Sequence, residues 1–446
     1  MRKLLLSPSA PRLLLVWVLA LAALLPFLGH LAAFGRLFWF ADELDMVNEF
    51  DRLGFGRWLW LMFAENFVPL FKVLWGGLVF GGRGSYMVML AVLWATHALN
   101  VGLLAAWMRR ARFDAFAFAL AGLVFGLSAS NLETLTWSIQ WSAVLAVTFF
   151  LLAGLNGSPS EEAGAPGRPR RNPLGVIIPC AASALVFSRG VLTGLIMGLR
   201  MLDPTLRPPA RWSRRLLVAA GCAIPSLAVA LVIYAHTAGA HPASGPGAAH
   251  WRDKVGFGLW FFSLNPIVPF LAIAPENWGI PAVGWPAVLL CGLGKAAVIA
   301  VALAWSSPAQ RRMLAPLLAL DLANACLLGY GRGEADLGHA MSSRYQYNAL
   351  LCFAPFLGAA LSRAADRLVP RGGLRVVLLP ALLFLAAWES SRRWSALLPP
   401  WVEWRGGGSR RLLLGTNPVP PGYDLVGIPF LDNVRAKELV DKYNLH

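Results

Sequence analysis

The stretch from Ser85 to Met108 decides the fold class: it reads SYMVMLAVLWATHALNVGLLAAWM and is followed at once by Arg109 and Arg110. An α-helix needs about 20 mostly apolar residues to cross the hydrocarbon core of a bilayer. Basic residues beside such a helix mark its cytoplasmic end. This stretch therefore predicts a transmembrane helix that runs toward the cytoplasm.

The composition of the whole chain supports the same class. Of its 446 residues, 57% are hydrophobic and only 14% are charged, whereas soluble domains carry about a quarter charged residues. A soluble protein of this composition would expose large apolar patches to water. Apolar runs of spanning length recur along the chain, so a soluble enzyme, a disordered chain and a fibrous protein are excluded. We predict an all-α polytopic membrane protein with about 11 transmembrane helices.

The net charge of +16 comes mostly from arginine, because only six of the 39 basic residues are lysine. Many arginines stand in short clusters between apolar runs, as expected for cytoplasmic loops. We therefore interpret the charge as a marker of orientation and expect no nucleic-acid partner. The clusters are Arg109, Arg110 and Arg112; Arg168, Arg170 and Arg171; Arg211, Arg214 and Arg215; and Arg311 and Arg312.

The first apolar run, Leu13 to Phe34, follows three basic residues and is longer than the apolar core of a signal peptide. We interpret it as an uncleaved span with its N-terminus in the cytoplasm. Because Ser85 to Met108 runs inward, residues 35–84 make no net crossing. They mix aromatic with charged residues, which is typical of helices that lie in the membrane interface. This segment is predicted to be a first outer loop with one or two interfacial helices.

The run Leu174 to Leu202 has arginine-rich sequence on both sides, so both of its ends should be cytoplasmic. Its 29 residues span only about 44 Å as one helix, whereas two full crossings need about 60 Å. We predict a pair of short helices that bend at Ser188-Arg189-Gly190. Arg189 would then lie deep in the protein and need an anionic partner or a water-filled cavity.

The remaining runs complete a transmembrane domain over residues 1–388. Val255 to Pro275 is broken by Asn265-Pro266 and is predicted to be re-entrant or interfacial. Residues 389–446 follow as a C-terminal tail or small extramembrane segment on the periplasmic side, although Arg392, Arg393, Arg410 and Arg411 run against the charge rule there. The other predicted spans are Ala115–Leu132, Trp137–Leu155, Arg215–His236, Gly284–Trp305, Met313–Tyr330, Tyr345–Leu361 and Leu374–Trp388.

Three carboxylates, Asp42, Glu43 and Asp45, open the outer loop directly after the first span. One interpretation is a solvated loop start or a helix cap at Asp42. The other is a site, because carboxylates that line a cavity at the membrane face are free to titrate.

Further polar residues follow in a recognisable order: Glu65, Pro69-Leu70, Lys72, and then His97 and Asn100 before Arg109-Arg110. In this order the chain resembles the GT-C membrane glycosyltransferases, in the broad group of protein mannosyltransferases and bacterial lipid-A aminoarabinose transferases. Many bacterial members have Glu-His-Arg where this chain has Glu65-Asn66-Phe67. Phe187 to Gly190 and the Arg344-Tyr345 pair resemble later parts of the same pattern.

The resemblance implies a GT-C-like fold and transfer of a sugar from a polyprenyl-phosphate donor to a glycan, lipid or protein acceptor. It assigns the base for the acceptor hydroxyl to Asp42, with Glu43 or Asp45 as the fallback. Guanidinium groups suit the departing phosphate. The implied phosphate-binding residues are Arg344, Arg189, Lys72 and Tyr345, and the implied cavity-lining residues are Glu65, His97, Asn100 and Glu133.

Structural roles compete with several of these assignments. Arg344 could anchor the interface beside its tyrosines, and Arg189 could pair with a buried carboxylate. His97 and Asn100, one helical turn apart, are expected to form hydrogen bonds between helices, as Asp321 and Asn324 could in a later span. Glu133 could be a solvated helix end.

A metal centre is not predicted. The five cysteines lie inside apolar runs without metal-site spacing, and His236, His241 and His250 share one loop without the spacing of a zinc site. Asp42-Glu43-Leu44-Asp45 leaves open a divalent cation, Mg²⁺ or Mn²⁺, held partly by water.

The sequence thus predicts a membrane glycosyltransferase of a bacterial inner membrane with its active site on the periplasmic side. A polysaccharide polymerase or ligase is the nearest alternative, but the main catalytic loop of those enzymes comes late in the chain. A flippase of a lipid-linked saccharide would also explain a buried arginine, but alternating access favours sites near the membrane midplane.

Overall fold

The computed structural model describes residues 10–158, 172–203, 212–240, 251–272, 283–332, 337–368, 372–422 and 431–446. Across these ranges the regular secondary structure is helical, and the only strand-like contact is an isolated antiparallel bridge between Phe63 and Asn66. The all-α polytopic membrane class is confirmed.

Seven helices in the described ranges are long and apolar enough to cross a membrane. They become eight if the bent pair Ala115–Leu127 and Ala129–Thr136 is one span. A count of about eleven is therefore not confirmed. The seven are Arg12–Gly29, within α2 (Ala10–Ala22) and α3 (Leu25–Gly29); α7 (Tyr86–Arg110); Ser138–Gly157, made of η2 (Ser138–Gln140) and α10 (Trp141–Gly157); α13 (Trp212–Ala240); α16 (Trp285–Trp305); α17 (Pro308–Arg332); and α18 (Ser343–Leu368).

Two predicted spans are built from shorter helices: Leu13–Phe34 is divided among α2, α3 and α4 (Leu31–Phe34), and Ala115–Leu132 among α8 (Ala115–Leu127), η1 (Ala129–Asn131) and α9 (Leu132–Thr136). The predicted re-entrant run forms α14 (Trp251–Leu264) and α15 (Ile267–Ala272), separated at Asn265-Pro266. The other elements are α5 (Asp42–Trp60), α6 (Pro69–Gly81), α11 (Leu174–Val186), η4 (Ser188–Gly190), α12 (Val191–Leu202), η7 (Leu337–Met341), α19 (Gly372–Val402), η8 (Glu403–Gly407), α20 (Gly408–Leu413) and α21 (Asn433–Tyr443).

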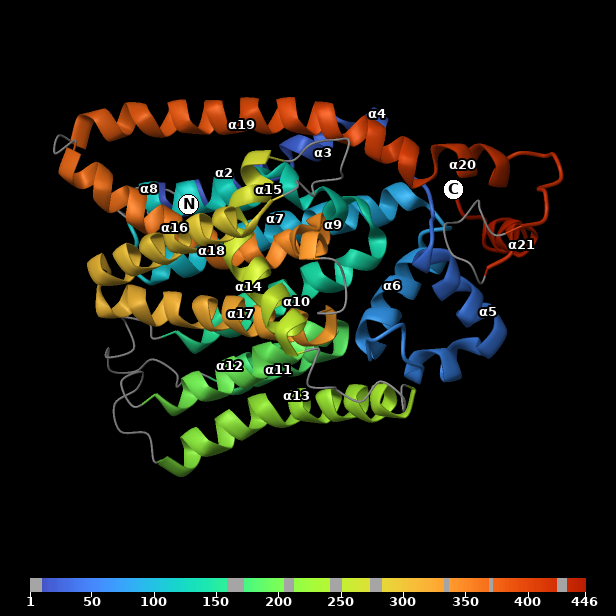
Figure 1. Ribbon diagram of the computed structural model, residues 1–446, viewed down its shortest axis with the longest axis horizontal. Helices are drawn as coiled ribbons and strands as arrows, with labels where there is room; N and C mark the ends of the chain where they lie inside the picture. Colours follow the sequence, from blue (N-terminus) through green and yellow to red (C-terminus); the bar gives the residue numbers. More distant parts are fainter. Residues whose placement is uncertain are drawn as a thin grey trace.

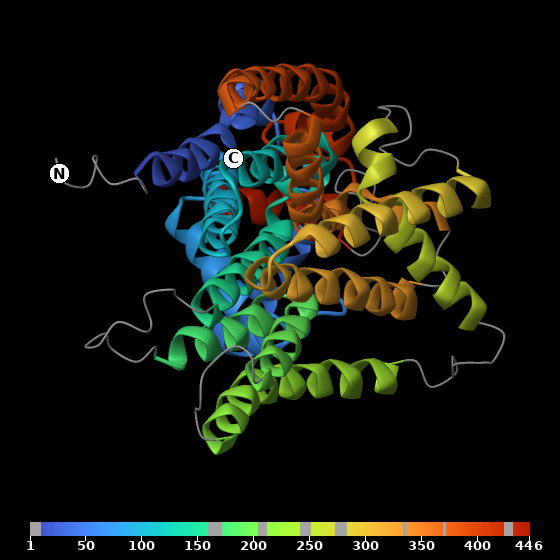
Figure 2. The same ribbon diagram turned by 90° about the vertical axis from the view of Figure 1, so that its left-hand side faces the viewer.

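The long helices run along the long axis of the molecule, and α5, α6, α20 and α21 gather at one end of it (Figure 1). We call this the α5 end. Seen from the side, α19 and α13 lie at opposite edges of the bundle (Figure 2). The start of α7 is at the α5 end, since the Tyr86 hydroxyl donates to Glu43. Arg109 and Arg110, which close α7, therefore lie at the opposite end.

The run Leu174 to Leu202 forms the predicted pair of short helices, α11 and α12, with η4 at the bend. Gly190 is required there, because a Cβ atom on it would stand 1.8 Å from the Ser183 carbonyl oxygen. The close approach of the two half-helices places Arg189 at the tip of the hairpin.

The 35–84 segment contributes two helices, α5 and α6, and neither is a candidate span. α5 is mixed in polarity, and α6 has only 13 residues. This agrees with the prediction that the segment makes no net crossing.

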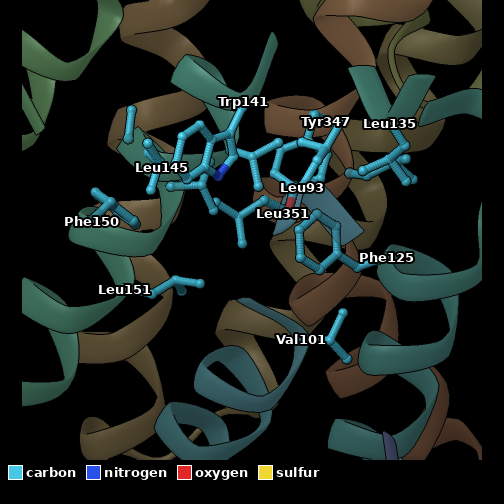
Figure 3. Close-up of a cluster of buried hydrophobic side chains, with 14 of the residues drawn as sticks. Leu93, Val101, Phe125, Leu135, Trp141, Leu145, Phe150, Leu151, Tyr347 and Leu351 are labelled. Carbon is cyan, nitrogen blue, oxygen red and sulfur yellow. The ribbon is translucent and has the colours of Figure 1, made fainter. Parts of the chain in front are cut away.

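The largest buried cluster joins the spans around Tyr347 of α18 (Figure 3). Its ring lies among Leu93 of α7, Phe125 of α8 and Leu351, one turn further along α18. Its ring centroid is 5.0 Å from that of Phe125. Side chains from three helices thus meet at one position, which fixes the start of α18 against α7 and α8.

The C-terminal segment, residues 389–446, is folded onto the 35–84 segment. Asp51 of α5 accepts hydrogen bonds from Arg435, Lys442 and Tyr443. The chain end pairs with the backbone near α7, since His446 N–H donates to the Gly84 carbonyl and Tyr86 N–H to that of His446. Both segments therefore lie at the same end of the bundle.

Candidate functional site

A strained turn presents the first carboxylate of α5. Ala41 has φ 51° and ψ −122°, a backbone conformation that residues with a Cβ atom rarely adopt and that is common at functional sites. Asp42 is the first residue of the helix, and both Asp42 and Asp45 are partly exposed whereas Glu43 is fully buried. The three predicted acidic residues therefore face different surroundings.

Glu43 holds the turn together from inside the protein. Its carboxylate accepts hydrogen bonds from Phe40 N–H at 2.9 Å, Tyr86 hydroxyl at 2.9 Å and Ser138 N–H at 2.8 Å. Oε2 also lies 3.6 Å from Nη2 of Arg405. Burial raises the pKa of Glu43, and Arg405 opposes that shift. These contacts join α5 to the start of α7, to η2 and to the C-terminal segment.

Arg405 is enclosed by aromatic rings. Its guanidinium lies 4.8 Å from the ring centroid of Trp137, 5.5 Å from that of Phe40 and 6.0 Å from that of Trp401. Only 3% of its side chain is exposed. Arg405 is not among the residues that the sequence predicts for the site. The signal was an arginine among Trp401, Trp404 and Glu403 in a segment predicted to be outside the membrane.

The charges of two arginines, Arg405 and Arg344, act on Asp42. Burial raises the pKa of Asp42, while the charges of Arg405 and Arg344 lower it. Burial also raises the pKa of Asp45, and the Asp42 charge adds to that shift. Asp42 is therefore a partly exposed carboxyl group on which the charges of two arginines act.

Arg344 lies at the start of α18 and contacts Glu133 of α9. Its Nε is 3.6 Å from Glu133 Oε1, and its backbone N–H donates to Oε2. The guanidinium of Arg344 is 5.7 Å from the ring centroid of Tyr345, and that of Arg189 is 5.4 Å from the same ring. Tyr345 thus lies between two arginines from different parts of the chain. The structure brings together Asp42, Arg344, Tyr345, Arg189 and Glu133, all predicted as site residues.

Two of these guanidinium groups have buried N–H donors that make no hydrogen bond: Nη1 of Arg189 and Nε of Arg344. Arg189 instead lies 4.8 Å from the ring centroid of Phe187. The side chains of Arg189 and Arg344 are both partly exposed, but a buried N–H donor without an acceptor is costly. Donors of this kind are suited to an anionic group brought by a ligand.

The turn between α5 and α6 lies close to Arg189. Glu65 forms an ion pair with Arg332 at the end of α17, at 3.2 Å, and both side chains are about half exposed. The Asn66 side chain accepts a hydrogen bond from Ser188 N–H, beside Arg189. The charge of Arg332 also acts on Arg189. Glu65 is therefore paired with Arg332, close to the arginine cluster formed by Arg189 and Arg344. Arg332 is not among the residues that the sequence predicts for the site.

Lys72 is fully buried behind α5 and does not face the arginine cluster. Its Nζ donates to the carbonyls of Trp58 and Leu61 and lies 4.0 Å from Glu49 Oε2. Burial lowers the pKa of Lys72 to about 8 and raises that of Glu49 to about 7. The contacts of Lys72 with Trp58, Leu61 and Glu49 all lie within the 35–84 segment. Lys72 therefore packs the end of α5 against α6.

His97 and Asn100 are fully buried between spans. His97 Nε2 donates to the Gly126 carbonyl, and Nδ1 lies 3.0 Å from the Tyr347 hydroxyl. Asn100 donates to that hydroxyl and to the Val144 carbonyl. Their described partners are groups on other helices, which corresponds to hydrogen bonds between helices and not to side chains that line a cavity.

A second charged group lies elsewhere, within the spans. Asp321 of α17 is 2.6 Å from Nζ of Lys295 in α16, and both are buried. Lys295 also donates to the carbonyls of Phe262 and Asn265, where α14 ends. This arrangement stabilises the break between α14 and α15.

Among the residues that the structure describes, no group of three or more His, Cys, Asp and Glu side chains could hold a metal ion. One or two carboxylates with water and a substrate phosphate can hold Mg²⁺, so the divalent cation that Asp42-Glu43-Leu44-Asp45 leaves open stays a prediction. His241 and His250 lie outside the described residues.

Comparison of the chain with models of protein families, with curated proteins and with solved structures finds no match. The resemblance to GT-C enzymes therefore depends on the residues quoted from the sequence.

Proposed function

We propose that the protein is a membrane glycosyltransferase that transfers a sugar from a polyprenyl-phosphate donor to an acceptor at the periplasmic face of a bacterial inner membrane. The observation that carries the proposal is that Asp42, on its strained turn, is acted on by the charges of Arg405 and Arg344, while Arg189, on the far side of the Tyr345 contact with Arg344, has an N–H donor without a hydrogen bond. A base and an anion site side by side are what this reaction requires.

In the proposed reaction the Asp42 carboxylate accepts the proton of the acceptor hydroxyl. The hydroxyl oxygen then bonds to the anomeric carbon of the donor sugar. The bond between that carbon and the phosphate oxygen breaks, and the phosphate leaves with the electron pair. Arg344 and Arg189 stabilise the charge that develops on it, since planar guanidinium groups match phosphate oxygens.

The test uses purified full-length protein in vesicles and a panel of polyprenyl-phosphate sugars, with release of the lipid phosphate as the readout. Asp42→Asn should lower turnover about 10²–10⁴-fold, the usual contribution of a general base. Asp441→Asn is the matched control, because that carboxylate is 61% exposed and, within the described part of the chain, its ion pair is with Lys437 one turn earlier along α21. Its turnover should equal that of the wild type.

Parallel arms separate the alternatives. EDTA tests for a divalent cation. Movement of lipid-linked saccharide across the vesicle bilayer without release of lipid phosphate would replace the proposal with a flippase. Full activity of Asp42→Asn would remove the assigned base.

A further inference from the structure

We propose that Arg405 is a positioning residue for Asp42, so that the C-terminal segment completes the site at the α5 end. The inference depends on the proposed function only for the role of Asp42. The contacts that carry it come from the 35–84 segment, from the turn between α9 and α10, and from η8.

The guanidinium of Arg405 has mostly apolar surroundings. Arg405 is buried among Trp137, Phe40 and Trp401. A buried cation needs counter-charge and hydrogen bonds to offset its loss of water. Nη1 donates to the Thr136 carbonyl at 3.4 Å, whereas Nη2 makes no hydrogen bond and lies 3.6 Å from Glu43 Oε2. Arg405 is therefore only partly satisfied by hydrogen bonds.

The counter-charge of Arg405 is Glu43. The Glu43 carboxylate already accepts hydrogen bonds from Phe40 N–H, Tyr86 hydroxyl and Ser138 N–H. The Glu43 contact with Arg405 is an ion pair at 3.6 Å without a hydrogen bond, so Nη2 of Arg405 stays open toward the turn that carries Asp42. Among the groups that lower the pKa of Asp42, Arg405 comes first and Arg344 second.

Two other charged side chains, Arg344 and Asp45, act on or near Asp42. Arg344, from α18, is itself opposed by Glu133. Asp45, on the same helix, repels the charge of Asp42 and is opposed by Arg52. Arg405 contacts the turn on both sides of Asp42, 5.5 Å from the Phe40 ring centroid and 3.6 Å from Glu43 Oε2, so its removal is expected to change the surroundings of the Asp42 carboxyl.

The segment around Arg405 is held in place by contacts with other parts of the chain, as a positioning residue requires. Trp401 donates from Nε1 to the Thr136 hydroxyl at 2.7 Å. Arg410 donates to the Gly35 carbonyl at 2.8 Å, and Glu403 pairs with Arg36 at 3.1 Å. η8 is thus fastened on both sides of Arg405 to residues that precede the Asp42 turn.

The test compares Arg405→Gln and Arg405→Lys with Arg411→Gln, an arginine of the neighbouring helix that is 77% exposed. The first readout is the pH profile of kcat/KM. The second is the titration of the Asp42 carboxyl, measured as the infrared difference spectrum between each protein and the same protein with Asp42→Asn added. The second readout requires no turnover, so it decides the inference even if the wild type transfers no sugar, in which case the proposed function alone fails.

In Arg405→Gln the Asp42 titration and the acid limb of kcat/KM should move up by about one pH unit, as expected when a nearby opposite charge is lost. Below both limbs this is about a tenfold lower kcat/KM. Arg405→Lys should restore most of the titration, and Arg411→Gln should not change it.

Glu43→Gln provides the opposite sign and covers the case in which Arg405→Gln fails to fold. It removes a negative neighbour and leaves Arg405 unopposed, so the Asp42 titration should move down. An unchanged Asp42 titration in the folded variants, or shifts of Arg405→Gln and Glu43→Gln in the same direction, would overturn the proposal.

Discussion

Glu43 and Arg405 form a buried ion pair, with 3.6 Å between Oε2 and Nη2, and so join the segment after the first span to the segment after the last helix of the bundle. Both side chains are almost fully buried, at 0% and 3% exposure. A pair of this kind depends on both partners, because the group left behind keeps its charge in a dry environment.

Glu43→Ala is expected to destabilise the protein by about 3–5 kcal/mol, since Arg405 would be left without its counter-charge. Phe40 N–H, Tyr86 hydroxyl and Ser138 N–H would also lose their acceptor. Thermal unfolding in detergent micelles measures the change. Glu438→Ala, which removes an exposed pair with Arg435, should cost at most about 1 kcal/mol. Equal losses in the two variants would contradict the central role of the Glu43–Arg405 pair.

Glu49 should make stability depend on pH. Its pKa is raised to about 7 from an ordinary value of 4.5, so the folded state binds more protons than the unfolded state between these values. The stability of the wild type should therefore fall as pH rises from 4.5 to 7, by about 1–3 kcal/mol. Glu49→Gln cannot titrate and should lose this fall. A wild type and a variant with parallel stability curves over this range would disprove the assignment.

Gly84 should be intolerant of a side chain. Its φ is +70°, and a Cβ atom would stand 2.4 Å from the Asn444 carbonyl oxygen. Gly84→Ala is expected to destabilise the docked C-terminus by about 1–3 kcal/mol and to speed cleavage of α21 by protease. Gly77→Ala is the control, because a Cβ atom there meets nothing within 4 Å in a helix. Equal protection of α21 in both variants would be the contrary result.

The Tyr347 hydroxyl should contribute to packing of the spans, since it joins His97 of α7 to Asn100 one turn later. Tyr347→Phe is expected to cost about 0.6–1.7 kcal/mol, the range of hydrogen bonds between membrane helices. Tyr330→Phe, whose ring is 65% exposed, should cost nothing measurable. Unfolding of both variants in the same detergent decides the matter, and an unaltered Tyr347→Phe protein would count against the network.

Arg189 should govern affinity for the donor phosphate, given its unpartnered Nη1. Arg189→Gln is expected to weaken binding of a polyprenyl phosphate about 10–100-fold, the value of a hydrogen bond to a charged group. Binding is measured by titration of the lipid into protein in micelles. Arg214→Gln, an exposed arginine near the start of α13, serves as the control. Unchanged affinity in Arg189→Gln would exclude it from the anion site.

Much of the helical framework follows from local sequence. The apolar run before Arg109-Arg110 predicts α7, and the 29 residues of Leu174 to Leu202 are too few for two full crossings, which predicts the α11–α12 hairpin. The span count was harder to predict, since the run Ala115 to Leu132 is bent between α8 and η1, and the run Leu374 to Trp388 is part of the longer helix α19. The polar order Asp42, Arg189 and Arg344 predicted residues that the structure brings together.

The sequence by itself determined the membrane class, the hairpin and the identity of the acidic turn, because these depend on the apolar length and residue order of single segments. Only the tertiary structure decided that Glu43 is buried while Asp42 is partly exposed, and that Arg405 pairs with Glu43. The physical reason is that a buried charge is tolerated only beside its partner. That partner is supplied by a segment whose distance along the chain carries no information about its distance in space.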